Sequence, residues 1–260
     1  MKKIAFILIF QVFLIVNIHA SQHVYETIDS QQKIPKSILF VGNSYLYYND
    51  SLHNHFKRMV EERRPGYDGG SNVKSATIGG SRLKHHDLDH LLGYKAISSV
   101  DQFDLVILQG GSGESLSKKD RDYFSKVAKE YINKIKSIGA DAALYMIHAY
   151  TESHKDYSPN LIRVIEEMYT KVGKENNTLV IPVGLAFENA YKKKPNIKLH
   201  KIDGTHPDLL GTYLAACVVY TSIYKDNPIG ISYDYNGAIN PEEKLFLQTI
   251  AYETIQQYFN

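Results

Sequence analysis

Short runs of apolar residues, each followed by glycine or polar residues, recur along the chain. The clearest are 38–41 and 104–108, in which nearly every side chain is aliphatic or aromatic. Less regular runs follow at 73–78, 142–147 and 178–183. A short apolar run bounded by turn residues is typical of a strand buried on both faces. The pattern therefore predicts five buried strands.

The segments between these runs carry apolar residues at a spacing of three or four, which predicts helices. Asn49, Asp50 and Ser51 offer N-caps for the first of them, and Ser117 offers one for a longer helix that Gly139 ends. Strands that alternate with helices favour a parallel sheet covered on both faces. We expect an α/β protein, a three-layer α/β/α sandwich with a five-stranded parallel sheet. The helices are expected at 52–64, 81–92, 118–138, 159–174, 185–191 and 209–224, with a last one over 247–258.

The first twenty residues differ from the rest of the chain. Lys2 and Lys3 precede a mostly apolar stretch over 4–18, and Ala20 is a small residue at a suitable cleavage point. This pattern predicts a signal peptide over 1–20, with an uncleaved membrane anchor as the alternative. No cysteine follows the apolar stretch, which excludes a lipoprotein anchor. We expect an irregular leader over 21–36 and one domain over 37–260, exported to the periplasm or outside the cell and free of the membrane after cleavage.

The amino-acid composition excludes only a few classes of protein and partner. The 260 residues are 43% hydrophobic and 22% charged, as in a globular domain. The formal net charge of +2 gives no indication of a nucleic-acid partner. Tyrosine is frequent, at 20 residues, which suits an aromatic-lined sugar site. The single cysteine, Cys217, lies in an apolar run and is interpreted as a buried small hydrophobic residue.

Two stretches carry the residues of a nucleophilic site. Ser44 lies just after the first strand, where Gly42 permits a turn, and ligands of parallel sheets bind beyond such strand ends. Asp203 lies three residues before His206, a spacing that lets the carboxylate reach the imidazole and leave its other nitrogen free to act as a base. The alternative for Asp203 is an ordinary turn with an N-capping side chain.

Oxyanion donors are expected from two glycine-bearing loops. Gly79 and Gly80 follow the second strand, and Gln109 begins the run Gln-Gly-Gly-Ser-Gly after the third. Backbone N–H groups there, with the Gln109 amide, are able to converge on a developing negative charge. Taken singly, each is better explained as a loop glycine that needs a positive φ or as a polar residue at a strand end.

The order of these stretches resembles the SGNH hydrolase superfamily, also called GDSL-like esterases, over about 38–220. Gly42-Asn43-Ser44 is similar to the first conserved block of that family, 76–81 to the second, and Asp203-Gly204-Thr205-His206 to its D-x-x-H. The runs 181–184 and 203–216 resemble a secreted branch found in Bacteroidetes. The resemblance implies a flavodoxin-like SGNH fold, Ser44 as nucleophile, His206 as base, Asp203 as its orienter, and the Ser44 and Gly80 amides as oxyanion donors.

Two positions depart from the family pattern. Asn43 stands where the family usually has Asp, which keeps hydrogen bonding but loses the charge. The third block usually reads G-x-N-D, whereas this chain is closer to the Q-G-E-S variant of sialate and acetylxylan esterases. Gln109 is therefore expected to take the donor role, with Ser112 as the alternative.

The resemblance implies a secreted serine esterase that hydrolyses short acyl esters, O-acetyl foremost, on carbohydrate, with no metal or cofactor. One alternative is a glycan-binding module that keeps the fold without turnover. A glycosidase using Glu114 with Asp203 is disfavoured, because it leaves Ser44 and His206 unexplained.

Two other groups of polar residues are candidates for a functional role. His86 and His90 have the spacing of a helical zinc pair, but no third ligand is evident, and a solvated helix face explains them better. His148, Tyr150 and Glu152 follow the fourth strand on the predicted functional edge, where we expect them to line the substrate cleft.

Overall fold

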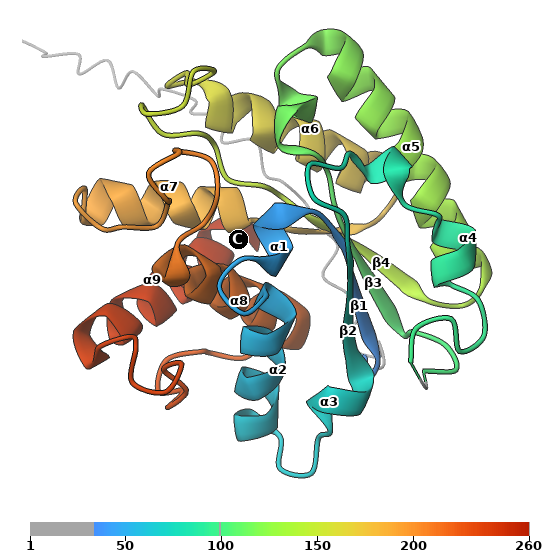
Figure 1. The fold of residues 1–260 in the computed structure, drawn as a ribbon, viewed down its shortest axis with the longest axis horizontal. Coiled ribbons are helices and arrows are strands. Elements are labelled where there is room, and N and C mark those ends of the chain that lie inside the picture. The colour runs from blue at the N-terminus through green and yellow to red at the C-terminus, as the bar shows by residue number, and fades with distance from the viewer. Residues whose placement is uncertain (1–33, 99, 260) are drawn as a thin grey trace, which may run out of the picture.

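The computed structural model describes residues 34–98 and 100–259, so the predicted signal peptide and most of the leader lie outside it. A five-stranded sheet with the order β2-β1-β3-β4-β5 forms the centre of the fold (Figure 1). Every neighbouring pair of strands is parallel. The strands are β1 (Ile38–Gly42), β2 (Val73–Thr77), β3 (Leu105–Gln109), β4 (Asp141–Tyr145) and β5 (Leu179–Ile181).

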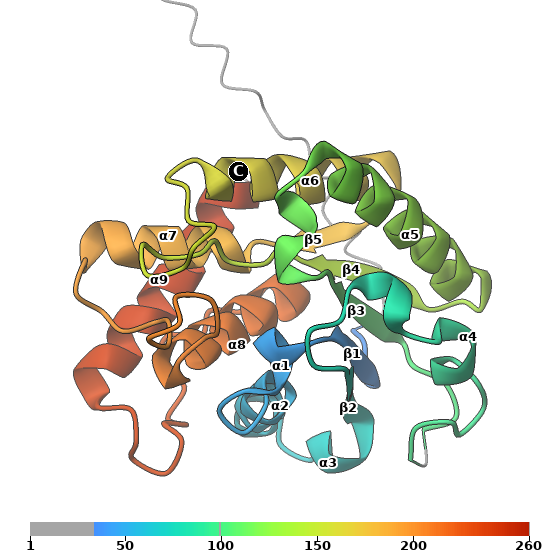
Figure 2. The same cartoon turned by 45° about the horizontal axis from the view of Figure 1, so that its top comes forward.

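Helices cover both faces of this sheet, as Figure 2 shows. α5 (Lys118–Ser137) and α6 (Leu161–Glu175) lie on one face, and α2 (Leu52–Arg63) and α8 (Leu209–Tyr224) lie on the other, with α9 (Pro241–Phe259) packed outside α8. α7 (Val183–Lys193) follows β5 and contacts α6, α8 and α9. The predicted α/β/α sandwich is confirmed.

α8 is the most deeply buried helix, because it lies between the sheet and the outer helices. Every side chain from Gly211 to Tyr224 is buried, including Cys217, as its apolar surroundings in the sequence predicted. A helix that is apolar on all sides is stable only in such a position. None of the helices in the described part of the chain is long and apolar enough to cross a membrane.

Several short elements differ from the prediction. The continuous helix expected over 81–92 is wrong: a 3₁₀ turn, η1 (Leu83–His85), and one helical turn, α4 (Leu88–Leu91), take its place. A second helical turn, α1 (Ser44–Tyr47), begins directly at the predicted nucleophile. The remaining short elements are α3 (Gly69–Asn72) and η2 (Ser112–Ser115).

The turn between α1 and α2 has an unusual backbone. Asn49, Asp50 and Ser51 have φ values of 54°, 66° and 64°, a conformation that side-chain-bearing residues seldom adopt. Ser51 occupies the N-cap position of α2, but its hydroxyl donates to the Leu46 carbonyl instead of capping the helix. Asn49 donates from its amide to the Pro207 carbonyl at 2.9 Å, which fastens this turn beside the predicted Asp203–His206 segment.

Candidate active site

Ser44 is held at the carboxyl end of β1 by its neighbour Asn43. The Asn43 carboxamide accepts from the Tyr45 N–H at 3.0 Å and so caps α1, and it donates to the Ser81 carbonyl at 3.0 Å. Gly42 allows the chain to pass very close to the third strand, since a Cβ there would lie 2.3 Å from Oε1 of Gln109. Ser44 is therefore the first residue of a helical turn whose position is set by three strands.

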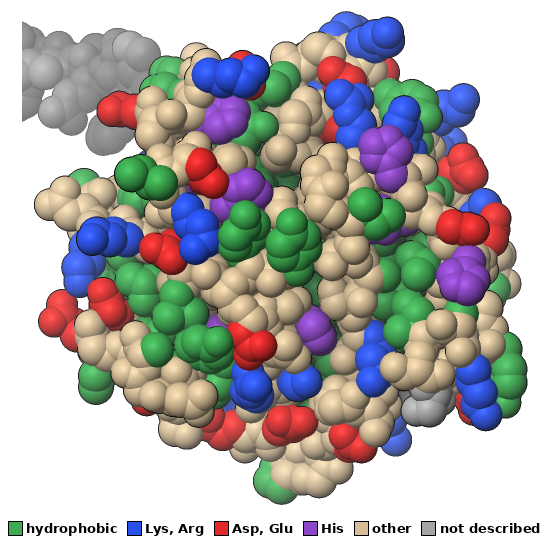
Figure 3. Space-filling model, in the orientation of Figure 1, with side chains coloured by type: hydrophobic (Ala, Val, Ile, Leu, Met, Phe, Trp, Pro, Cys, Tyr) green, Lys and Arg blue, Asp and Glu red, His purple; other side chains and the backbone are tan. Residues whose placement is uncertain are grey.

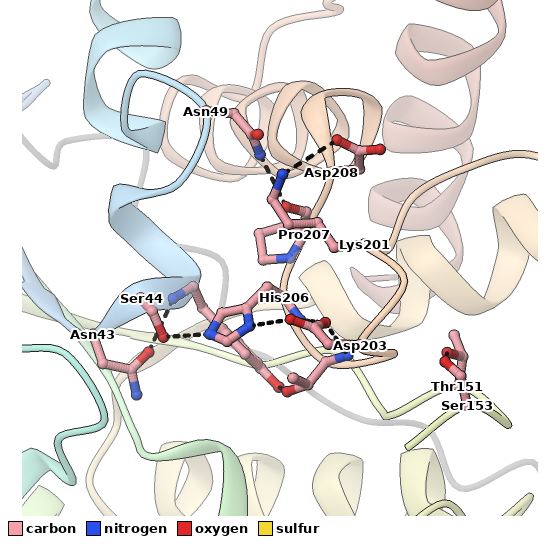
Figure 4. A network of polar contacts seen from close by, with 12 residues as sticks. Asn43, Ser44, Asn49, Thr151, Ser153, Lys201, Asp203, His206, Pro207 and Asp208 are labelled. Carbon is pink, nitrogen blue, oxygen red and sulfur yellow. Dashed lines mark hydrogen bonds and ion pairs between the residues drawn. The ribbon is translucent and has the colours of Figure 1, made fainter.

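The structure brings Ser44, His206 and Asp203 into one hydrogen-bonded chain (Figure 4). Nε2 of His206 lies 2.9 Å from Oγ of Ser44, and Nδ1 of His206 lies 2.7 Å from Oδ2 of Asp203. A carboxylate only accepts, so Nδ1 carries the hydrogen and Nε2 faces the serine hydroxyl as an acceptor. This tautomer is the one that a general base requires.

Asp203 also organises its own loop. Its Oδ1 accepts from the N–H groups of Thr205 and His206, both at 3.0 Å, which fixes the turn between the acid and the imidazole. Burial raises the pKa of Asp203, but these N–H groups and the His206 side chain outweigh it and lower the pKa to about 2. Asp203 is therefore a carboxylate at any pH at which the protein is expected to work.

Thr205 is fixed from two further sides by aromatic residues. Nε2 of His148 bonds to the Thr205 carbonyl at 2.8 Å, and the Tyr45 hydroxyl bonds to Oγ1 of Thr205 at 2.7 Å. The His148 ring is stacked between Tyr45, at 4.3 Å between centroids, and Phe187, at 4.4 Å. The residue after the nucleophile is thus tied directly to the residue before the base.

Comparison with known proteins identifies structures of similar fold. No protein-family model matches the sequence, and no curated protein matches it. A DUF4886 family protein from Bacteroides uniformis is similar in structure, with a TM-score of 0.65 and 18% identity over 86% of this chain and 96% of that one. A Slackia heliotrinireducens protein assigned to the SGNH hydrolases has a TM-score of 0.55 at 18% identity, covering 72% and 98%. An acetyl xylan esterase has 0.55 at 20%, also covering 72% and 98%.

This chain has the SGNH hydrolase fold. The predicted fold class and the resemblance stated from the sequence are confirmed at that level. Likeness at such low identity concerns the fold and assigns no role to an individual residue.

Within this SGNH fold, two backbone N–H groups are available near the nucleophile. The Ser44 N–H stands at the first position of α1, where no carbonyl of the helix lies behind it. Gly80 is exposed with φ of 66°, and its N–H donates to no acceptor in the described part of the protein. Both are free to donate to a developing oxyanion.

Gln109 does not present a free carboxamide to Ser44. Its Oε1 accepts from the Asn43 N–H at 2.8 Å, and its Nε2 donates to the Gly110 carbonyl. The side chain is only 1% exposed and lies under Gly42. The expectation that Gln109 faces the oxyanion is therefore not met in this geometry, in which the amide instead joins the first and third loops of the site.

A substitution distinguishes the two possible roles of Gln109, as an oxyanion donor or as a structural link between two loops. Gln109→Met keeps the volume but leaves a buried donor and a buried acceptor unpaired, so we expect the free energy of unfolding to fall by about 2–4 kcal/mol. Urea denaturation measures it, with the exposed Gln102→Met as control. A variant that is as stable as the parent yet several hundredfold slower would instead identify Gln109 as an oxyanion donor.

The other residues of that loop lie close by. Ser112, the alternative donor, influences the phenols of Tyr45 and Tyr150, where its hydrogen bonding opposes the rise in pKa that burial causes. Glu114 is 1% exposed and accepts from the Gly111 N–H, and burial raises its pKa. A buried loop-closing carboxyl has no access to a sugar, which weakens the glycosidase alternative further.

The segment after β4 lines the site less than expected. The expectation that His148 contacts the substrate is wrong, because its side chain is 1% exposed and enclosed by aromatic rings. Tyr150 is 7% exposed and stacks on His154 at 3.8 Å. Glu152 is exposed, and its part in the cleft stays a prediction. A polar residue at a strand end is equally typical of a cleft and of a buried contact, so only packing distinguishes them.

The histidines considered for zinc are separated by the broken helix. His86 is 5% exposed, and its Nε2 lies 3.1 Å from the Ser81 hydroxyl, while His90 is exposed on α4. The described residues contain no group of three or more ligand side chains able to hold a metal ion.

An aromatic rim beside His206 was missed by the sequence reasoning. Tyr48 packs on the imidazole at 4.5 Å between centroids, and Tyr47, which is 42% exposed, stacks on Tyr48 at 5.4 Å. Lys201 holds its ammonium 5.4 Å from the Tyr48 ring, and Ile202 is 98% exposed next to Asp203. The paired tyrosines three and four residues after the nucleophile were the available signal, since α1 is too short to bury both.

Proposed function

We propose that this protein is an exported serine esterase that removes short acyl groups, O-acetyl foremost, from carbohydrate. The observation that carries the proposal is the continuous contact from Ser44 through His206 to Asp203, with distances of 2.9 and 2.7 Å. A nucleophile, a base and an orienting carboxylate in such contact are the parts that acyl transfer requires.

The reaction follows from these contacts. Oγ of Ser44 attacks the ester carbonyl carbon as Nε2 of His206 takes the hydroxyl proton, and the Ser44 and Gly80 N–H groups bind the oxyanion. Collapse of the tetrahedral intermediate expels the alcohol, which receives the proton from His206. A water molecule then attacks the acyl-serine with His206 again as base, which releases the carboxylic acid and restores Ser44.

Three observations support carbohydrate as the alcohol. The neighbouring structures include an acetyl xylan esterase and an acetyl-xylooligosaccharide esterase, each at 20% identity or below. The exposed Tyr47 and the half-buried Tyr48 beside His206 offer an apolar ring face with a polar tip, a surface that suits a sugar. The basic and apolar N-terminal stretch favours export, which would place the enzyme where polysaccharides occur.

Covalent labelling tests the proposal. A fluorophosphonate probe is expected to label the protein, and peptide mapping is expected to find the adduct on Ser44. The purified protein should also hydrolyse p-nitrophenyl acetate. A folded protein that takes up no probe and hydrolyses no short acyl ester would refute the esterase.

The competing proposal is a glycan-binding module without turnover. It is favoured by one observation, the engagement of both Gln109 amide atoms with the protein, which removes a side-chain donor from the oxyanion site. In that case glycan binding would persist while labelling and hydrolysis are absent.

A further inference from the structure

A second concave site lies beside the predicted oxyanion loop. It is a groove of about 750 Å³ between η1 and the first turns of α5. Five cationic side chains line it, and Figure 3 shows lysine and arginine gathered over the start of α5 (upper right). These cations are Arg82, Lys84, Lys118, Lys119 and Lys126.

The cations outnumber the carboxylates of the groove, which are Asp120 and Asp122. Arg82 pairs with Asp120, and Lys118 pairs with Asp122 at 2.6 Å. The other three cations, Lys84, Lys119 and Lys126, have no carboxylate partner within the described ranges. The groove therefore carries an excess of three positive charges, while the whole chain has a formal charge of only +2.

Two of these lysines occupy an electrostatically unfavourable place. Lys118 and Lys119 are the first two residues of the 20-residue α5, at the positive end of its dipole. A cation there destabilises a helix by up to about 1 kcal/mol, whereas an anion stabilises it. Lys118 and Lys119 therefore contribute little to the stability of the fold. An anion bound in the groove would interact favourably both with these lysines and with the helix dipole.

An aromatic ring completes the groove. Tyr123 is 40% exposed, and the Lys84 ammonium lies 5.0 Å from its ring centroid. An exposed ring face among ammonium groups suits a sugar that carries a carboxylate better than a bare anion. A volume of about 750 Å³ lies within the range that encloses a small organic ligand, such as a short stretch of polysaccharide.

Arg82 links the groove to the loops of the active site. Arg82 follows Gly80 by two residues, and a Cβ on Gly111 would lie 3.1 Å from Cγ of Arg82. The Ser81 carbonyl between them accepts from the Asn43 amide, next to Ser44. Arg82 therefore lies in the loop that carries Gly80 and is joined through Ser81 to the residue before the nucleophile.

We propose that this groove binds the acidic backbone of the substrate, so that the enzyme deacetylates a uronic-acid-containing polysaccharide. The proposal rests on the esterase function above and names its substrate class. A nucleic acid is the less favoured polyanion, because three unpaired cations are confined to one short groove instead of following an extended backbone.

Kinetics on matched polymers test it. Acetylated polygalacturonate is compared with the same polymer after its carboxyl groups have been reduced. At low salt, we expect kcat/KM to be at least about tenfold higher for the acidic polymer, because a cleft of one charge concentrates an oppositely charged substrate. The preference should largely disappear at 0.5 M salt, where the Debye length is about 4 Å.

Two triple variants with the same change in net charge localise the effect. K84Q/K119Q/K126Q should lose the preference for the acidic polymer, whereas K36Q/K192Q/K198Q, made at exposed lysines outside α5 and α6, should keep it. Both should hydrolyse p-nitrophenyl acetate like the parent. Equal rates on the two polymers, or an equal loss in both variants, would overturn the groove proposal while leaving the esterase intact.

A binding measurement that needs no hydrolysis tests the groove proposal separately from the esterase proposal. Calorimetry with unacetylated polygalacturonate should show binding by the parent and at least about tenfold weaker binding by K84Q/K119Q/K126Q. If hydrolysis and labelling both fail, this measurement still judges the groove. Equally tight binding of single-stranded poly(dT) would show a general polyanion surface and contradict the proposal.

Discussion

Ser44→Ala is expected to lower kcat for p-nitrophenyl acetate by at least about 10⁴-fold, since removing the nucleophile of such a triad leaves only binding and oxyanion stabilisation. The Ser44 hydroxyl is the only group in contact with Nε2 of His206 in the described structure, at 2.9 Å. KM should change little, because a single hydroxyl contributes little to ground-state binding. Steady-state kinetics on the purified variant measure both quantities.

Stability must be unaffected for this result to be informative. Ser44 is 7% exposed, and its hydroxyl bonds only to His206, so the thermal midpoint should move by less than about 3 °C. Ser125→Ala, on α5, is the matched hydroxyl deletion, because this hydroxyl bonds only to the Arg121 carbonyl of its own helix, and it should keep full activity on this small ester. If Ser44→Ala hydrolyses the ester at the parental rate, another nucleophile acts and the proposed mechanism fails.

Acid is expected to destabilise the protein well above the pH range in which carboxylates titrate. Burial lowers the pKa of His148 well below its ordinary value of 6.5, with a further contribution from the nearby His200. Burial also lowers the pKa of His200 to about 4. Both imidazoles are therefore neutral in the folded protein at pH 5, while the unfolded chain takes up a proton at each.

The direction of the effect follows from this difference. The unfolded chain binds more protons below pH 6.5, so stability is complete above that pH and is lost as the pH falls toward the folded pKa. A group with pKa 6.5 unfolded and about 4 folded contributes a loss of about 2 kcal/mol at pH 5. Burial of His148 lowers its pKa as well, so this second imidazole adds to the loss in the same direction.

Urea denaturation at pH 7 and pH 5 measures this loss. His200→Gln should reduce the difference between the two pH values by about 2 kcal/mol, because one of the buried titrating groups is gone. His90→Gln, at an exposed position on α4, should leave the difference as it is. A parent protein equally stable at both pH values would show that these imidazoles are protonated, or solvated, in the folded state.

The sequence was informative wherever chemistry and periodicity agree. Apolar runs marked β1, β3, β4 and β5, because a strand buried on both faces has no polar side to show. β2 is a partly exposed edge strand with the sequence VKSAT, and its end was marked by Gly79 and Gly80. Ser44 and the Asp203–His206 pair were recognisable because each combines a turn with a reactive side chain. Their meeting then follows from the parallel sheet, whose carboxyl ends all lie at one edge.

Gln109 and His148 show where this reasoning reaches its limit. Both are polar residues at strand ends, and both were expected to face the site. Gln109 lies opposite the Asn43 N–H through the register of β1 with β3, and His148 falls between Tyr45 and Phe187. Neither contact can be predicted from the neighbouring sequence. Asn43 is 66 residues from Gln109, and Phe187 and Tyr45 are about 40 and about 100 residues from His148.

The order of residues thus specified the layers of the fold and the identity of the three reactive side chains, since hydrophobic period and side-chain chemistry are local properties. Tertiary packing decided which polar groups remain free to act and which are consumed in holding the loops. It also gathered the lysines of two distant segments into one groove that a near-neutral total charge conceals. Hydrogen-bond capacity and electrostatic field depend on which atoms become neighbours, and only the folded chain determines that.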